Sequence, residues 1–140
     1  MSDRISSDIL SVLDMCAQDL GKSVCESVYA IILGRDKGVM TALRLADGDM
    51  DRALASFDKL VAALFDNGAA EFIIAHSHPR RTDMALSAED ICATERISAL
   101  AGRLGFRLVE HVIMTECGYI YALRTMGQRG YHPDKYRIKE

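Results

Sequence analysis

Two histidines one residue apart, His76 and His78, are the residues whose type and spacing most suggest chemistry in this chain of 140 residues. They follow the apolar run EFIIA, which predicts a buried strand. Alternate residues of a strand share one face and lie roughly 7 Å apart, so both imidazoles can approach one ion. The spacing suits a zinc site, and the competing interpretation is two polar residues where a strand leaves the core.

A catalytic zinc needs a third protein ligand and an open position, and Asp90 is the nearest candidate. Ser87 is a favourable N-cap for the helix that follows, which places Asp90 in the first turn, near the loop that His78 begins. Ser87 and Asp90 also fit a capping box, so a structural role for both is the alternative. Of the remaining histidines, His111 is expected to be structural, with a carboxylate as a candidate partner, and His132 to lie on the surface.

Hydrophobic spacing predicts the elements that must position these residues. Helices are expected at 5–20, 49–66 and 88–103, and strands at 27–33, 39–46, 71–76, 106–114 and 118–124. The second helix is expected to bury Leu54, Phe57, Val61 and Leu64, and the segment from Gly127 to be a loose polar tail. The order α-β-β-α-β-α-β-β mixes hairpins with crossovers, which predicts an α/β mixed (α+β) fold with helices flanking a mixed sheet.

Composition and charge narrow the classes of function. Apolar residues make up 49% of the chain, which predicts one globular domain, over residues 1–126, with a sizeable core. The apolar runs are too short to span a bilayer, and the N-terminus lacks the apolar block of a signal peptide, so we expect a cytoplasmic protein without a membrane partner. A net charge of −3 argues against strong binding of nucleic acid. The four cysteines show no CxxC spacing, which predicts unpaired core thiols.

The motif HSHP followed by SAED resembles the signature of the JAB/MPN metalloproteases, or JAMM proteins: Glu, then His-x-His-Pro, then Ser-x-x-Asp. The RadC-like branch is the most similar, because Ile91 and Thr94 match its Ile-x-x-Thr and the segment EHVI matches its strand of the type Asp-His-Val-Ile. The resemblance covers about residues 26–124. It implies a JAB/MPN fold, similar to the cytidine-deaminase-like architecture. We expect a single JAB domain without the N-terminal DNA-binding-type module usual in that branch.

This resemblance also implies a function, that of a zinc-dependent peptidase or isopeptidase. His76, His78 and Asp90 would hold one Zn²⁺ ion, and Glu26, directly before the first strand, would be the general base. Ser87 would donate a hydrogen bond to the oxyanion. The implied partner is a peptide or protein substrate with an amide or isopeptide bond. The oligomeric state is open, and a homodimer is compatible with the sequence.

Spacing separates this chain from the family pattern at one point. The family places ten residues between the second histidine and the aspartate, and Glu89 stands at that distance from His78, with Asp90 one residue further. We expect a one-residue loop insertion, which changes the loop-closure entropy little. Consecutive helical residues point about 100° apart, so Asp90 is expected to face the sheet with Thr94 and Ile97, and Glu89 to face outward.

Arg80 and Arg81 stand where RadC-like proteins usually have Ser-Gly. They predict a basic loop that captures a substrate carboxylate, or else a solvated loop. Zinc nucleoside deaminases need His-x-Glu and Pro-Cys-x-x-Cys, and the sequence contains neither. Two alternatives to a protease remain open. One is a catalytically weak or inactive scaffold of the same fold, and the other is a module linked to DNA repair, which rests on analogy alone.

Overall fold

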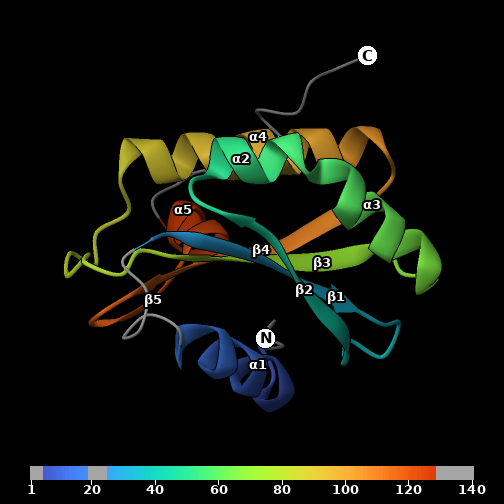
Figure 1. The fold of residues 1–140 in the computed structure, drawn as a ribbon, viewed down its shortest axis with the longest axis horizontal. Helices are drawn as coiled ribbons and strands as arrows, with labels where there is room; N and C mark the ends of the chain where they lie inside the picture. The colour runs from blue at the N-terminus through green and yellow to red at the C-terminus, as the bar shows by residue number, and fades with distance from the viewer. Residues whose placement is uncertain (1–4, 19–24, 129–140) are drawn as a thin grey trace.

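A five-stranded mixed sheet forms the centre of the computed structural model, which describes residues 5–18 and 25–128 (Figure 1). The strands are β1 (Ser27–Leu33), β2 (Val39–Asp47), β3 (Glu71–Ser77), β4 (Arg107–Thr115) and β5 (Gly118–Tyr121). The helices are α1 (Ser7–Ala17), α2 (Met50–Ala55), α3 (Phe57–Asp66), α4 (Ala88–Arg103) and α5 (Ala122–Gln128). The strand order is β2-β1-β3-β4-β5, and β3 pairs with β4 in parallel while the other neighbours pair antiparallel. The predicted mixed sheet is confirmed.

Helices cover both faces of this sheet, with α1 on one face and α2, α3 and α4 on the other (Figure 1). Side chains along β3 alternate between the two faces of the sheet, so this strand contributes residues to the apolar core on each face. Phe72 and Ile74 pack with the residues of α2, α3 and α4, whereas Ile73 and Ala75 pack with those of α1. His76 continues the first series, so its side chain faces the layer that contains α4.

The predicted second helix is divided at Ser56, which has φ −105° and ψ 22°. Its fully buried residues are Met50, Ala53, Leu60 and Leu64, whereas the predicted Leu54 and Phe57 are half-buried and pack against the same core, so full burial is confirmed only at Leu64. The buried positions 50, 53, 60 and 64 are spaced by three, seven and four residues, which still fits one helical period, so the predicted stripe was displaced by one residue at Leu54 and Val61.

The last predicted strand ends at Tyr121, and the chain continues as α5. Glu110 on β4 is buried, and its carboxylate accepts the backbone N–H groups of Leu123 and Arg124 at 2.6 and 3.2 Å. A carboxylate at a helix N-terminus satisfies N–H groups that have no partner within the helix. Gly127 and Gln128 complete α5, and the rest of the predicted tail lies outside the described residues, as does His132.

Two further expectations concern the whole chain. In the part that the structure describes, no helix has both the length and the apolar character needed to cross a bilayer. The four cysteines, all described, form no disulfide. Cys16 is buried, but Cys25, Cys92 and Cys117 are exposed, so the expectation of core thiols is wrong for these three.

Candidate metal centre

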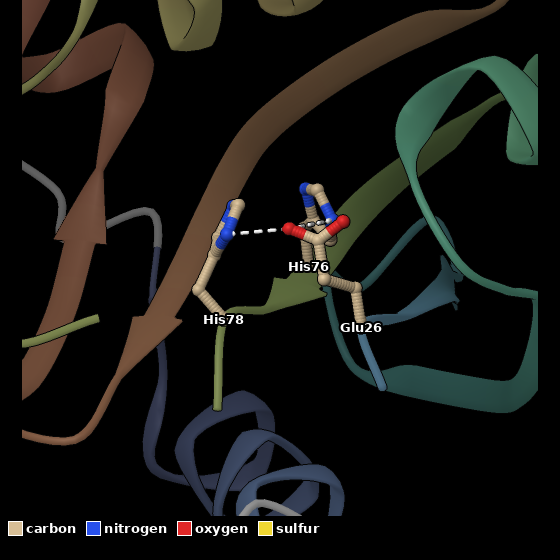
Figure 2. Close-up of side chains that lie close together, drawn as sticks. All are labelled: Glu26, His76 and His78. Atoms are coloured by element: carbon tan, nitrogen blue, oxygen red, sulfur yellow. Dashed lines mark ion pairs between the residues drawn. The ribbon is translucent and has the colours of Figure 1, made fainter. Parts of the chain in front are cut away.

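His76 and His78 lie at the end of β3, and Glu26 directly precedes β1, the antiparallel neighbour of β3. Ser27 is the register partner of Ser77, and the Ser27 N–H donates a hydrogen bond to the Ser77 hydroxyl oxygen at 3.0 Å. This pairing brings the Glu26 carboxylate to the two imidazoles, as Figure 2 shows. The Oε1 atom of Glu26 is 2.7 Å from Nδ1 of His78 and 3.9 Å from Nε2 of His76.

Glu26, His76 and His78 form what we call the histidine cluster, and the structure suits it to a metal ion. Among the described residues, these three form the group of His, Cys, Asp and Glu side chains whose ligand atoms all lie within 4.8 Å of one another. The Nε2 atoms of both histidines are buried without a hydrogen-bond partner in the described part of the chain. A buried polar atom without a partner costs about 1–3 kcal/mol. Two imidazoles and a carboxylate are a donor set that zinc uses, so the residues fit this ion.

Burial keeps both imidazoles in the neutral form that a metal ligand requires. It is the main cause that lowers the pKa of His76 to about 3, and the neighbouring His78 and His111 add to the effect. Burial also lowers the pKa of His78, although the Glu26 carboxylate acts in the opposite direction. Neutral histidines have a nitrogen lone pair available at neutral pH.

Asp90 approaches the histidine cluster from α4. It is buried together with Thr94 and Ile97, and Glu89 is exposed, which confirms the predicted rotation of the helix. Asp90 and the histidine cluster line one open cavity of about 330 Å³. Asp90 is therefore the inward-facing acid of the pair, as predicted, although the exposed Glu89 also lines the cavity.

The carboxylate of Asp90, however, is already paired with the guanidinium of Arg81. The Nη1 atom of Arg81 donates to Oδ1 at 3.1 Å and its Nη2 atom donates to Oδ2 at 2.8 Å. The backbone N–H of Ser87 also donates to Oδ2, at 2.9 Å. Burial alone would raise the pKa of Asp90, but the hydrogen bonds from Arg81 and Ser87 outweigh it and hold this pKa below its ordinary value. Asp90 is thus paired with a cation of the chain itself, and its role as a metal ligand stays a prediction.

The remaining predicted site residues, Arg80, Arg81 and Ser87, lie in the segment between β3 and α4. Ser87 and Asp90 form the capping box that was the structural alternative, since the Ser87 hydroxyl oxygen accepts the Asp90 N–H at 3.1 Å. Arg80 is exposed, whereas Arg81 also donates to the carbonyl oxygens of Asp83 and Ala85 at 3.2 and 2.6 Å. The oxyanion role of Ser87 and the substrate-binding role of both arginines stay predictions.

His111 on β4 is a residue of the cavity that the sequence did not single out as functional. Its ring centroid is 6.3 Å from that of His76, and its Nε2 atom is also buried without a hydrogen-bond partner among the described residues. The Thr94 hydroxyl is 2.7 Å from both Nδ1 of His111 and the carbonyl oxygen of Asp90.

These two short contacts determine which ring nitrogen of His111 carries the proton. A hydroxyl has one proton, so both contacts contain a hydrogen only if Thr94 donates to the Asp90 carbonyl and His111 Nδ1–H donates to Thr94. The Nε2 atom then has a bare lone pair in the cavity. The expected partner was a carboxylate, but the ring bonds to a hydroxyl. The sequence feature that could have indicated His111 as a site residue was a histidine within the apolar segment VEHVIM.

The mixed sheet and the histidine pair at a strand end are features of a JAB/MPN-type domain, and comparison with known proteins agrees. A family model of the RadC-like JAB domain matches residues 6–128. The chain therefore belongs to the RadC-like JAB domain family.

Relatives of this chain include three bacterial proteins that share the name UPF0758. It is 29% identical over 116 residues to the UPF0758 protein of Bordetella bronchiseptica, covering 80% of this chain and 51% of the relative. It is 27% identical over 129 residues to a UPF0758 protein of Neisseria meningitidis serogroup C, covering 92% and 55%. It is 26% identical over 102 residues to a UPF0758 protein of Porphyromonas gingivalis, covering 73% and 44%. The chain spans about half the length of the curated relatives it matches.

Proposed function

We propose that this chain is a zinc-dependent hydrolase of amide or isopeptide bonds. The observation that carries the proposal is the pair of buried imidazole nitrogens without hydrogen-bond partners among the described residues, beside a carboxylate in an open cavity. Membership of the RadC-like JAB domain family is consistent with this class of enzyme. The relatives carry only the name UPF0758, so the activity itself rests on the site.

In this proposal, His76, His78 and Asp90 would hold the ion. Zinc in such a site supplies Lewis acidity, which lowers the pKa of a water molecule toward neutrality and polarises a carbonyl group. Glu26 takes the proton from the attacking water and passes it to the leaving amine, since its side chain is about one-third exposed and borders the cavity. Ser87 donates a hydrogen bond to the carbonyl oxygen as negative charge develops there.

The proposed substrate is a peptide or protein, and the proposed location is the cytoplasm. The cavity is lined by several acidic residues, namely Glu26, Asp49, Asp51, Glu89 and Asp90. Arg96 also lines it but is paired with Asp51 at 3.0 Å. An acidic cavity repels phosphate groups, so it disfavours nucleic acid as the substrate.

A second candidate is a JAB-fold scaffold that is catalytically weak or inactive and binds a partner protein. The ion pair between Arg81 and Asp90 favours it, because a carboxylate already neutralised by a guanidinium is a poorer ligand for zinc. The two candidates differ in whether the protein needs zinc, since the scaffold binds its partner with or without metal. They differ also in whether Glu26 is needed for turnover.

The test compares Glu26→Gln with Glu116→Gln, an acid in the exposed turn after β4. Both variants and the wild type are purified without chelator, and zinc content is measured with hydrolysis of a panel of fluorogenic peptide amides and isopeptides. We expect Glu26→Gln to keep zinc and to lose hydrolysis by about 100-fold or more, the usual range for a general base. Glu116→Gln should retain both properties. Wild-type protein without zinc would overturn the enzyme proposal and leave the scaffold, whereas Glu26→Gln with full activity would overturn the role of Glu26 as general base.

A further inference from the structure

The side chain of Arg81 ties the loop after β3 to the start of α4. Its guanidinium donates to both carboxylate oxygens of Asp90 and to the carbonyl oxygens of Asp83 and Ala85. The Arg81 side chain is 16% exposed and that of Asp90 is 8% exposed, so water screens the pair weakly. Arg81 is therefore half-buried and held within its own loop.

The backbone of Arg81 is held as well. Its N–H donates to the His78 carbonyl oxygen at 3.1 Å, and its own carbonyl oxygen accepts the Glu116 N–H at 2.9 Å. The neighbouring Arg80 is exposed. Two adjacent arginines of the same loop thus have different surroundings, and Arg80 offers a matched control for Arg81.

The guanidinium also acts electrostatically on the histidine cluster. Its positive charge contributes to the lowered pKa of His76 and of His78, after burial and other neighbours. A divalent cation bound by these histidines would be repelled by the guanidinium and attracted by Asp90. The Oδ2 atom of Asp90 already accepts two hydrogen bonds, from Arg81 and from Ser87. A cation that recruits Asp90 must therefore displace Arg81 from the carboxylate.

We propose that Arg81 is a built-in competitor of the metal ion for Asp90, so that metal binding releases Arg81 and loosens the loop over residues 80–86. This inference rests on the proposed function, in which Asp90 is the third ligand. Release of the guanidinium removes its hydrogen bonds to the carbonyl oxygens of Asp83 and Ala85 as well. Metal occupancy is thereby coupled to the order of the loop that connects His78 and Asp90, two residues that line the cavity.

The first test is a zinc titration of the wild type, Arg81→Ala and Arg80→Ala, each in metal-free form. We expect Arg81→Ala to bind zinc about tenfold more tightly, within the range by which groups around metal ligands change metal affinity. Arg80→Ala should match the wild type in zinc affinity, because Arg80 is exposed and is not the partner of Asp90. The double variant Arg81→Ala/Asp90→Ala should lose the gain. Arg81→Gln should show the same increase in zinc affinity. It retains an amide donor for the loop carbonyls, so it perturbs the loop less than Arg81→Ala does.

The second test is hydrogen exchange of the loop amides with and without zinc. In the wild type, zinc should speed exchange over residues 80–86, and in Arg81→Ala exchange should already be fast and insensitive to zinc. Weaker zinc binding by both Arg81 variants would overturn the inference and make Arg81 a support for Asp90. If no form binds zinc, the proposed function fails too, whereas equal binding by the wild type and both Arg81 single variants overturns the competition alone.

Discussion

At the end of β3, the Nε2 atoms of His76 and His78 are buried without a hydrogen-bond partner in the described part of the chain, whereas at the start of α4 both carboxylate oxygens of Asp90 accept hydrogen bonds. The two halves of the candidate site therefore line one cavity, but they differ in whether these side-chain atoms have hydrogen-bond partners. Leaving imidazole nitrogens unpaired costs free energy of folding. Such a cost is expected where a ligand from outside the chain completes the site.

Only the histidine half is thus arranged to receive a ligand. The Asp90 half is stable without one, since Arg81 neutralises its charge and Ser87 satisfies a remaining acceptor site. Removal of one partner should consequently have different results in the two halves. In the histidine half it should affect binding, and in the Asp90 half it should affect stability as well.

The largest expected effect is on zinc binding by His76→Ala and His78→Ala. Each substitution removes an imidazole from the histidine cluster, so stoichiometric zinc should be lost while the far-ultraviolet circular dichroism spectrum is retained. Among the described residues, no hydrogen bond of Nε2 is lost in either case. Metal analysis and calorimetric titration check the result. His132→Ala, outside the described residues, is the histidine control, and zinc content equal to wild type in all three variants would contradict the assignment.

Asp90→Ala should lower both the zinc content and the free energy of unfolding. Without the carboxylate, the half-buried guanidinium of Arg81 loses its ion-pair partner and keeps only the carbonyl oxygens of Asp83 and Ala85, so the cost should stay below the roughly 3–5 kcal/mol of breaking a fully buried ion pair. Urea unfolding of the metal-free protein measures the change. Glu89→Ala, at the adjacent exposed position, should keep zinc and unfold like the wild type. Zinc loss with Glu89→Ala alone would show that the strict family spacing holds.

Lowering the pH should destabilise the metal-free protein. The pKa values of His76 and His111 are about 3 and about 4 in the folded chain, below the ordinary 6.5, chiefly because both are buried. Below pH 6.5 the unfolded chain binds protons that the folded chain excludes, so stability falls as the pH falls. From pH 6.5 to about 5 the loss should be on the order of 2 kcal/mol for each histidine.

Urea unfolding at several pH values measures this dependence. The lowered pKa of Asp90 acts below its ordinary value of 3.8, so its contribution should persist throughout that window. A pH profile that stays flat between 7 and 5 would mean that the imidazoles are not held neutral by burial. The His111→Asn variant should reduce the slope, because one titrating group is removed.

Thr94→Val should have the smallest effect. It removes the hydroxyl that bonds Nδ1 of His111, which costs about 1 kcal/mol or somewhat more for the buried N–H left without a partner. Nitrogen NMR should show the proton of His111 on Nδ1 in the wild type and in Thr94→Ser. A proton on Nε2 in the wild type would refute the assigned tautomer.

Features that depend on neighbouring residues could be predicted from the sequence. The run EFIIA before His76 predicted β3, because strand periodicity and apolar character are local. Ser87 predicted the start of α4, and the 100° rotation between residues predicted that Asp90, and not its neighbour Glu89, turns inward. The break at Ser56 and the helix after Tyr121 were missed, because packing on the sheet and the Glu110 carboxylate from β4 decide them.

The candidate site divides in the same way between local pattern and long-range packing. The face of β3 that carries His76 and the face of α4 that carries Asp90 could both be predicted, since each follows from the period of one element. The contact of Glu26 with His78 and the contact of Arg81 with Asp90 emerge only in the folded chain. The first contact depends on the pairing of β1 with β3. The second depends on the course of a loop and on the conformation of a long, flexible side chain. Neither contact follows from a regular spacing of residues in the sequence.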